Sequence, residues 1–501
     1  MGDMLISALL RYKDRNAFHD GECFYTYHDI QKLVLQGMGR FKELGLLPGT
    51  TIAQLSGNRV EAFAFIATCM ISGMRFVALQ PKAGPVNNAQ IVNSSGATVL
   101  VVDETYEEQA VEITSCCRNL QHILSHDKKH NSLWSCSSPL ETLPSSAIGH
   151  AEDIARIAYT GGTTGQPKGV MLSNRAILQG ALNMLVGMRW PTHPRYLCCM
   201  PMSHGAGAMI APTLHLGGTI FIQQEFSTTA FMDAIEKHQC NVGWIVPTAL
   251  YKLLDDPRSL TIDWSVLQTL VYSAAPTSIS RIEQALELLG PCLVQLYGQT
   301  ESPSTVLALH QEDHHPGDPR LRSAGRPLPG LKVALLDDSG NEVEDNDIGE
   351  VCVRGPLMMS GYLNQPQETA SALKGEWLHT GDLGKRDGNG YIYLVDRKKD
   401  MIISGGFNVY PTEVELVLAA HPAVSNCAVI GVPDPLWGEK VTAYVAVKEG
   451  MQVSEDELIT LVRHQKGPVH APKKIHLVTQ LPLTNVGKVD KKLLRAKSEF
   501  I

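Results

Sequence analysis

The chain lacks three features that would indicate other classes of protein: an excess of basic residues, a long unbroken apolar run and a paired-cysteine motif. Its 501 residues include 43 Lys and Arg against 51 Asp and Glu, which gives a net charge of -8. Nucleic-acid-binding domains usually carry a basic surface, so we expect no nucleic-acid partner. The longest apolar run, residues 62–74, is interrupted by Thr68, Ser72 and Gly73. Because a membrane span needs about 18 apolar residues, we predict a buried helix there and no membrane span.

The eleven cysteines are scattered, and none of them forms a CxxC or other zinc-binding spacing. We therefore expect reduced thiols. Since the N-terminal residues carry no basic segment ahead of an apolar run, we also expect a cytoplasmic protein. His310 and His314 are four residues apart, which would suit a metal site. The Pro316 and Gly317 that follow, and the acidic neighbours, favour a solvated loop instead.

Glycine and threonine are concentrated in one segment, YTGGTTGQPKG at residues 159–169. Glycines allow positive φ angles and let backbone N–H groups approach an anion, while hydroxyl and ammonium groups add donors. The segment predicts a phosphate-binding loop, although a flexible turn has the same composition. It is not GxxxxGK[ST], because Pro167 precedes and Gly169 follows the lysine. The candidate phosphate-binding residues are Thr160, Gly161, Gly162, Thr163, Thr164, Gly165 and Lys168.

Strand-like and helix-like patterns alternate through the first 320 residues, for example TIAQL before EAFAFIATCM and TLVYS before SISRIEQALELL. This order is typical of parallel sheets covered by helices on both faces. After Gly325 strands and tight turns follow one another, in GEVCVRGP and GYIYLVD for example, which predicts a small β-barrel. Four charged residues at 397–400 then predict a hinge.

A chain of this length exceeds what one core usually supports, so we predict an α/β protein of two domains. The large N-terminal domain, residues 1–397, contains two helix-covered, mostly parallel sheets plus the small β-barrel. Residues 398–400 form the hinge, and residues 401–501 form a small, mobile α+β C-terminal domain. Within that domain, Ser454 and Glu457 have the pattern of a capping box and predict a helix start.

Eight motifs occur in an order that resembles the ANL superfamily of adenylate-forming enzymes, and among them the acyl-CoA synthetases. They are YTGGTTGQPKG, YSAAP (272–276), YGQTE (297–301), GRP (325–327), GEVCVRGP, TGD (380–382), DRKKDMIISGGFNVYPTEVE (396–415) and PLTNVGK, which ends at residue 488. The resemblance covers nearly the whole chain. It implies that a carboxylate attacks the α-phosphate of ATP, that pyrophosphate leaves, and that the acyl-adenylate passes its acyl group to the thiol of coenzyme A.

The same resemblance implies the roles of individual residues. The loop at 160–168 would hold the β- and γ-phosphates, Glu301 would ligate Mg²⁺, and Thr300 would donate to the α-phosphate. The nucleotide-binding set would also contain Ser273, Ala274, Ala275, Pro276, Tyr297, Gly298, Gln299, Asp382 and Arg397. In this set the aromatic ring of Tyr297 would stack on adenine, and Asp382 and Arg397 would reach the ribose. Taken singly, these three residues also fit a core tyrosine, a turn aspartate and a solvated arginine.

The C-terminal region would supply the catalytic Lys488, which bridges the acyl carboxylate and the nucleotide. Without the resemblance, the lysines around Lys488 would indicate a solvated basic tail. Lys399 would be the hinge residue. Rotation about it would present Ser404, Gly405 and Gly406, which line a tunnel for the phosphopantetheine arm of CoA. A tight turn after a strand explains these glycines equally well.

The acid pocket would come from residues 201–208 and 242–247, with His204, Gly205, Ala206, Trp244 and Val246 as its candidate residues. Amino-acid-activating relatives carry an Asp where this chain has Met202, Ser203 and His204, so an ammonium group would find no counter-ion. We therefore expect an aliphatic or aryl monocarboxylic acid. His204 would act at the carboxylate end, as a catalytic or gating residue, or pack as a structural histidine.

Coenzyme A is the expected acceptor, with an acyl or peptidyl carrier protein as the alternative. A catalytically silent nucleotide-binding protein is a third reading, which the presence of Glu301, Asp382, Arg397 and Lys488 disfavours. A luciferase-like oxygenase is a weaker one. The expected cofactor is Mg²⁺, with ATP and CoA as co-substrates, and the expected assembly is a monomer or homodimer.

Overall fold

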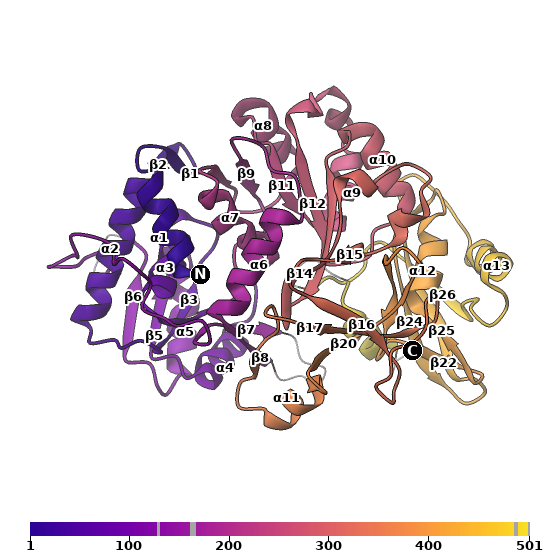
Figure 1. Cartoon of the computed structure of the whole chain (residues 1–501). Coiled ribbons are helices and arrows are strands. Elements are labelled where there is room, and N and C mark those ends of the chain that lie inside the picture. Colours follow the sequence, from indigo (N-terminus) through magenta and orange to yellow (C-terminus); the bar gives the residue numbers. More distant parts are fainter. Residues whose placement is uncertain (128–130, 161–166, 485–488, 499–501) are drawn as a thin grey trace.

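The computed structural model describes residues 1–127, 131–160, 167–484 and 489–498, with the backbone alone described at 497 and 498. Two large sheets dominate the N-terminal part of the chain (Figure 1). The first has seven strands in the order β18-β8-β7-β4-β3-β5-β6. These are β3 (Thr51–Leu55), β4 (Arg75–Ala78), β5 (Val99–Val102), β6 (His122–Ser125), β7 (Ile154–Thr160), β8 (Lys168–Ser173) and β18 (Gly361–Tyr362).

The second sheet has nine strands in the order β15-β14-β13-β12-β11-β9-β10-β1-β2. Its central strands run parallel, and β14, β15 and β2 join it antiparallel. The strands are β1 (Asn16–Asp20), β2 (Cys23–Thr26), β9 (Arg195–Cys198), β10 (Thr219–Ile222), β11 (Val242–Ile245), β12 (Thr269–Ser273), β13 (Leu293–Gln299), β14 (Ser302–Leu309) and β15 (Arg326–Pro327).

Helices fill the space between the two sheets and cover their outer faces. Buried residues of α1, α2, α3, α6 and α7 share one hydrophobic cluster with strands of both sheets, whereas α8, α9 and α10 cover the far face of the second sheet. The helices are α1 (Gly2–Arg11), α2 (Tyr27–Glu43), α3 (Val60–Ile71), α4 (Pro85–Ser95), α5 (Glu107–Ser115), α6 (Asn174–Val186), α7 (Ile210–His215), α8 (Thr228–His238), α9 (Pro247–Asp255) and α10 (Ile279–Leu289). The predicted parallel sheets covered by helices are therefore confirmed.

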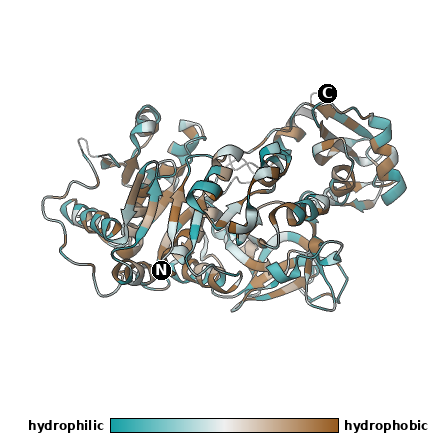
Figure 2. Cartoon of the chain, turned by 90° about the horizontal axis from the view of Figure 1, so that it is seen from above, coloured by the Kyte–Doolittle hydropathy of each residue, from teal (hydrophilic) through white to brown (hydrophobic). Residues whose placement is uncertain are grey.

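The apolar run at 62–74 forms most of α3, and its side chains are almost all buried, as predicted. Figure 2 shows hydrophobic colours concentrated on the strands and hydrophilic colours on the outer helices. Among the described residues, no helix combines the length and the hydropathy that crossing a bilayer requires.

A five-stranded antiparallel sheet lies where the sequence predicts a small barrel. Its order is β16-β17-β20-β19, with β21 beside β20, and the described strand pairs leave it as an open sheet. Its strands are β16 (Lys332–Leu336), β17 (Gly349–Arg354), β19 (Leu373–Lys374), β20 (Trp377–Arg386) and β21 (Ile392–Arg397). The helix α11 (Pro366–Ala372) directly precedes β19.

The C-terminal elements form a separate sheet, β23-β22-β25-β24 with β26 beside β25, drawn in orange to yellow in Figure 1. They are β22 (Ile402–Ser404), β23 (Phe407–Val409), α12 (Pro411–Ala419), β24 (Val424–Asp434), β25 (Gly438–Val447), α13 (Glu455–Lys466), β26 (Lys474–Val478) and α14 (Lys491–Ser498). Ser454 caps α13 by accepting a hydrogen bond from the backbone N–H of Glu457, as predicted. The domain boundaries at 397 and 401 remain a prediction.

One expectation was wrong. His314 is not in a solvated loop but buried, with 4% of its surface exposed, and its Nε2 lies 3.0 Å from the hydroxyl of Tyr272. Its Nδ1 lies 2.8 Å from the carbonyl oxygen of His310. Burial lowers the pKa of His314 to about 4. Pro316 and Gly317 lie after His314, at the later end of the segment, which is exposed.

Candidate active site

Two strand ends of the nine-stranded sheet bring the predicted nucleotide-binding residues together. Strand β12 ends at the buried Ser273, and Ala274, Ala275 and Pro276 follow it exposed to solvent. Strand β13 is parallel to β12 and ends at Gln299. The carboxyl ends of parallel neighbours share one sheet edge, which is where open α/β sheets bind ligands.

The turn between β13 and β14 consists of Thr300 and Glu301, since Gln299 pairs with Ser302. The chain is tightly packed just before it: a Cβ atom on Gly298 would lie 2.7 Å from backbone atoms of Ser304. Only glycine fits there. Ala274 on the neighbouring strand end has φ +83°, an uncommon conformation for a residue with a side chain. Both strand ends therefore have fixed and unusual backbone geometry.

Asp382 connects the predicted ribose-binding residues. The hydroxyl of Tyr297 donates to Asp382 Oδ2 at 2.6 Å, and Arg397 Nε lies 3.0 Å from Oδ1. Asp382 and Arg397 face each other across β20 and β21. Burial, and then the Asp382 carboxylate, raise the pKa of Tyr297, while Asp382 raises that of Arg397. The structure thus joins Tyr297 to a pair of residues that lies 85 or more positions later in the chain, in one hydrogen-bonded group.

The predicted metal ligand and the phosphate-loop lysine lie beside a residue that the sequence did not single out, Tyr362. Its hydroxyl donates to Glu301 Oε1 at 2.8 Å, and its ring centroid lies 5.3 Å from Lys168 Nζ. Lys168 itself forms an ion pair with Glu368 of α11. Within the described part of the chain, Glu301 Oε2 has no hydrogen-bonding partner, so one carboxylate oxygen is available to a hard cation such as Mg²⁺.

The predicted phosphate loop is described only at its two ends. Thr160 ends β7, where it pairs with Lys168. Gly161, Gly162, Thr163, Thr164 and Gly165 lie outside the described residues, and so does Lys488.

His204 is held at both ring nitrogens. Nε2 lies 3.1 Å from Gln80 Nε2, and Nδ1 lies 2.9 Å from Ser203 Oγ. The Gln80 amide and the Ser203 hydroxyl therefore hold the orientation of the ring.

The other predicted pocket residues differ in how far they are buried. Ala206 and Trp244 are buried, at 2% and 4% exposure, whereas Val246 is half-buried. A Cβ on Gly205 would lie 3.0 Å from Trp244 Cζ2. The indole therefore touches the loop that carries His204, and little space remains for a larger residue at 205.

Arg156 on β7 is a residue that sequence reasoning missed. One of its terminal nitrogens donates to the carbonyl oxygen of Ser203 at 2.5 Å, and its Nε is buried with no hydrogen-bonding partner among the described residues. Burial lowers the pKa of Arg156 to about 10. A strand pattern alone gives no sign that this side chain supports the His204 loop.

The predicted hinge is enclosed by ion pairs on either side of Lys399. Lys398 Nζ lies 2.6 Å from Asp338 and 3.7 Å from Glu350, and Arg495 bonds Asp400 at 2.8 Å. Burial lowers the pKa of Lys399. These contacts join the hinge to the antiparallel sheet on one side and to α14 on the other.

Gly405 and Gly406 form the two-residue turn of the β22–β23 hairpin, because Ser404 pairs with Phe407. Their φ angles are +59° and +82°, as expected for a hairpin turn of glycines. A Cβ on Gly405 would lie 3.1 Å from the indole of Trp437. Ser404 is buried, and its Oγ has no hydrogen-bonding partner in the part of the chain that the structure describes. The positive φ angles of the turn account for glycine at both positions. At Gly405 the nearby indole of Trp437 also leaves little room for a side chain.

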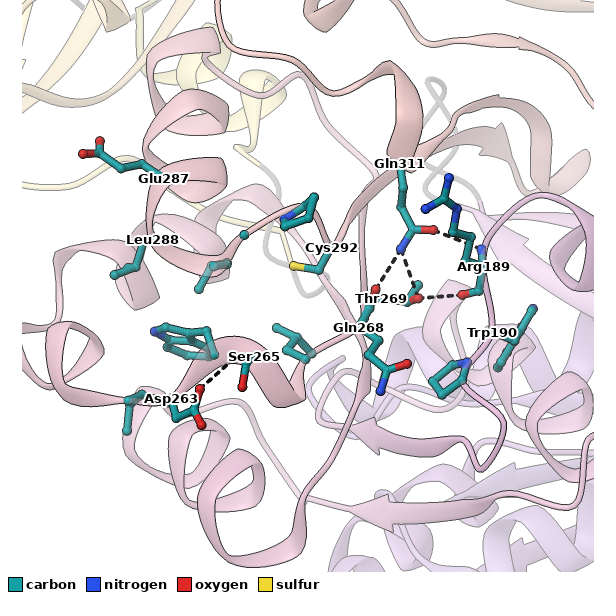
Figure 3. Close-up of a pocket in the computed structure, with 17 residues that line it drawn as sticks. Arg189, Trp190, Asp263, Ser265, Gln268, Thr269, Glu287, Leu288, Cys292 and Gln311 are labelled. Carbon is teal, nitrogen blue, oxygen red and sulfur yellow. Dashed lines mark hydrogen bonds between the residues drawn. The ribbon is translucent and has the colours of Figure 1, made fainter.

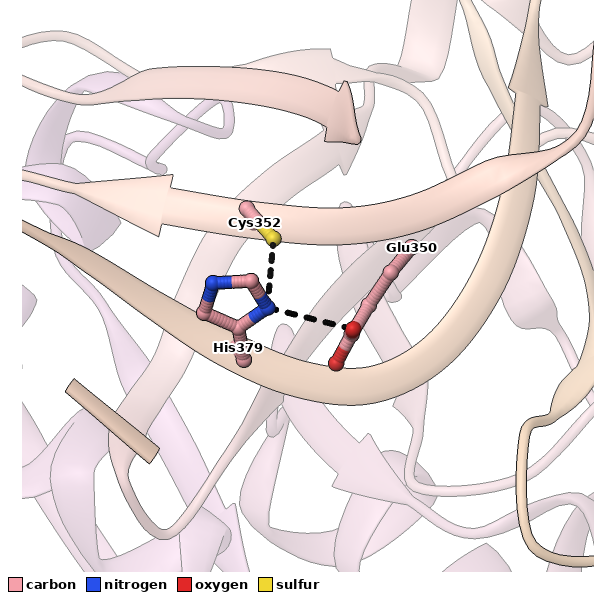
Figure 4. A group of neighbouring side chains, drawn as sticks. All are labelled: Glu350, Cys352 and His379. Carbon is pink, nitrogen blue, oxygen red and sulfur yellow. Dashed lines mark hydrogen bonds and ion pairs between the residues drawn. The ribbon is translucent and has the colours of Figure 1, made fainter. Parts of the chain in front are cut away.

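Two other features do not form part of this site. Glu350, Cys352 and His379 converge, with His379 Nδ1 3.1 Å from Glu350 and 3.4 Å from Cys352 Sγ (Figure 4). His379 and Glu350 already bond each other, and Lys398 Nζ lies 3.7 Å from Glu350. These contacts join β17 to β20.

A cavity of about 620 Å³ lies at the opposite edge of the nine-stranded sheet, where β12 and β13 begin (Figure 3). Gln311 bonds Gln268 and the backbone N–H of Arg189 there, so its polar groups already have partners. The cavity is therefore separate from the strand ends that carry the predicted site.

The chain is similar to known proteins over almost its whole length. The family described as AMP-binding enzyme matches residues 7–363, and its C-terminal domain matches residues 413–488. A medium/long-chain fatty acid–CoA ligase of Mycobacterium tuberculosis is 36% identical, over 99% of this chain and 90% of the relative. A feruloyl-CoA synthase of Amycolatopsis is 33% identical, over 96% and 95%. The solved structure of the amide bond synthetase McbA from Marinactinospora thermotolerans has a TM-score of 0.92 at 33% identity, covering 99% of this chain and all of that one.

Proposed function

The chain belongs to the AMP-binding enzyme family of adenylate-forming ligases, and from this premise we propose that it is an AMP-forming acid:CoA ligase for an aliphatic or aryl monocarboxylic acid. The observation that carries the proposal is the group formed by Tyr297, Asp382 and Arg397 beside the exposed strand end at Ala274. It offers an exposed strand end for adenine and a carboxylate whose two bonds a ribose can replace.

The proposed chemistry has two steps. A carboxylate oxygen of the acid bonds to the α-phosphorus of ATP, and the bond to pyrophosphate breaks. The sulfur of CoA then bonds to the acyl carbon, its proton is lost, and AMP leaves with both electrons of the broken C–O bond. Because the reacting groups in the first step are all anions, positioning and charge neutralisation supply most of the catalysis.

Individual residues of the chain would share this work. Lys168 would hold the departing phosphates and Thr300 the α-phosphate, both as point donors. Glu301 would hold Mg²⁺ through its free oxygen, and the ion would supply positive charge next to the phosphates. Lys488 would bridge the acid and the nucleotide during the first step and leave with the C-terminal domain, residues 401–501, before the second.

The acid class follows from the loop at 202–206. No acidic side chain is present between Met202 and Ala206, so an amino acid lacks a counter-ion for its ammonium group. His204 is bonded to Gln80 through Nε2 and to Ser203 through Nδ1, which supports a gating role over proton transfer. The relatives named for medium/long-chain fatty acids and for ferulic acid are consistent with an apolar tail.

The acceptor is the least constrained part of the proposal. A carrier-protein thiol is the alternative weighed from the sequence, and the likeness to an amide bond synthetase adds an amine as a second one. All three acceptors attack the same acyl-adenylate, so they share the first step.

An ATP–pyrophosphate exchange assay with a panel of fatty, aryl and amino acids tests the first step. We expect exchange with apolar monocarboxylic acids and none with amino acids. The best acid is then supplied with CoA, a phosphopantetheinylated carrier protein or an amine, and the products are separated by mass. Acyl-CoA as the main product supports the proposal; exchange with no acid would contradict it, and a dominant amide or acylated carrier would replace CoA as the acceptor.

A further inference from the structure

The short strand β18 and helix α11 contact both charged groups of the predicted phosphate and metal site. Tyr362 bonds Glu301 and lies under Lys168, while Glu368 forms the ion pair with Lys168. The backbone also joins the two regions, because the N–H of Met359 donates to the carbonyl oxygen of Glu301 at 2.8 Å. Residues 359–368 therefore contact both Lys168 and Glu301, which lie more than 130 residues apart in the chain.

Resting on the function proposed above, we propose that Tyr362 is a positioning residue that orients Glu301, and that Glu368 is the counter-ion that the phosphates of ATP displace from Lys168. Neither residue belongs to the motifs from which the site was predicted.

The position of Tyr362 is fixed by its own backbone. It pairs with Val170 on β8, two residues after Lys168, and its N–H donates to Thr369 Oγ1 at 2.9 Å. The phenol hydroxyl donates to Glu301 Oε1 at 2.8 Å. One oxygen of Glu301 is occupied in this way, and the other is left free for a cation.

The ion pair of Lys168 has the features of an exchangeable contact. The Glu368 side chain is half exposed, whereas that of Lys168 is largely buried, at 50% and 18%. A lysine ammonium is a point charge that accepts a carboxylate or a phosphate as its partner. ATP would replace one carboxylate with phosphates of higher charge. The apparent affinity for ATP is then lowered by the competition with Glu368.

The Tyr362→Phe variant tests the first half of the inference, and Tyr391→Phe is its matched control. Tyr391 also donates to a carboxylate, Asp313, at 2.7 Å, but lies outside the site. ATP binding is measured by calorimetry at increasing Mg²⁺, without acid or CoA. We expect Tyr362→Phe to need about tenfold more Mg²⁺ for half-maximal ATP affinity, the scale of one lost hydrogen bond to a charged group. The control should match the wild type. Equal Mg²⁺ dependence in all three proteins would overturn the positioning role.

The Glu368→Gln variant tests the second half. The control is Glu376→Gln, which removes an exposed partner of Arg354 in the same region. We expect Glu368→Gln to bind ATP about two- to fivefold more tightly, the scale of a partly exposed ion pair, with no gain when Lys168→Met is also present. Unchanged or weaker binding would overturn the exchange.

ATP binding by the wild type and by the variants distinguishes the proposed function from the proposed roles of Tyr362 and Glu368. A wild-type protein that binds no Mg·ATP would contradict the proposed function and this inference with it. A wild-type protein that binds Mg·ATP and catalyses acid-dependent exchange, with variants that behave like their controls, would contradict the inference alone.

Discussion

At the scale of single residues, Asp382 has the most specific environment in the site. It is 7% exposed, and each of its carboxylate oxygens has a different partner, the Tyr297 hydroxyl and the Arg397 guanidinium. A buried carboxylate with both oxygens bonded is costly to alter, because each lost bond to a charged group is worth about 1.5–3 kcal/mol.

We expect Asp382→Asn to weaken ATP binding by about 10- to 100-fold, since the amide loses its charge toward Arg397 and one of its acceptor atoms. Calorimetry with ATP and no acid measures this. Asp345→Asn is the matched control, because Asp345 also bonds an arginine Nε, that of Arg386, at 2.8 Å. ATP affinity that falls equally in both variants would indicate a general loss of fold instead of a nucleotide contact.

Lys488→Ala should cut adenylation by about 10²-fold, the scale of one main electrostatic contact in a transition state. Transfer of the acyl group from preformed adenylate to CoA should largely survive, because the proposed role of Lys488 ends with the first step. The two half-reactions are assayed separately by pyrophosphate exchange and by thioester formation. Lys492→Ala provides a nearby lysine control, and an equal loss in both half-reactions would remove Lys488 from this role.

Residues of the site differed in how far the sequence could predict them. Tyr297, Glu301, Asp382 and Arg397 belong to motifs, so the resemblance located them before any geometry was known. Tyr362 acts through a contact with a residue 61 positions away, and Arg156 through a bond to a loop carbonyl. Contacts of this kind leave no local pattern.

At the scale of elements, the strongly patterned segments were predicted well and the short ones were not. The buried helix α3 and the capped helix α13 follow from apolar runs and from Ser454. Strand β18 has only two residues and exists because it pairs with β8, about 190 positions earlier. Its formation depends on the tertiary fold, which explains why the segment that carries Tyr362 was missed.

A proline at Lys399 tests whether the chain rotates there between the two steps of the reaction. The backbone N–H of Lys399 makes no hydrogen bond within the described structure, so Lys399→Pro removes none and restricts only the backbone angles. We expect pyrophosphate exchange to stay near the wild-type rate and thioester formation to stop, because the second step needs rotation at this position. Lys399→Ala is the control that keeps the angles free. Normal overall turnover of Lys399→Pro would refute the hinge.

At the scale of the whole molecule, two buried histidines make stability depend on pH. Burial lowers the pKa of His126 to about 3 and that of His314 to about 4. Both are neutral in the folded chain at pH 5, whereas an unfolded histidine with a pKa near 6.5 is protonated there. The unfolded state then binds more protons, so stability falls as the pH falls.

Between pH 7.5 and 5 the free energy of unfolding should drop by about 2 kcal/mol for each of these histidines. Denaturant unfolding at both pH values measures the change. In a His126→Gln, His314→Gln double variant the drop should be smaller by the sum of the two contributions. The same drop in the double variant and in the wild type would assign the acid sensitivity to other groups.

The central claim is that the acid is activated by direct attack of its carboxylate on the α-phosphorus of ATP. The most direct measurement supplies an accepted acid with both carboxyl oxygens labelled by ¹⁸O, together with ATP and CoA, and determines by mass spectrometry where the label goes. The account predicts AMP carrying one ¹⁸O atom in its phosphate, acyl-CoA carrying the other ¹⁸O atom in its thioester carbonyl, and unlabelled pyrophosphate. Formation of ADP, or of AMP without the label, would contradict it.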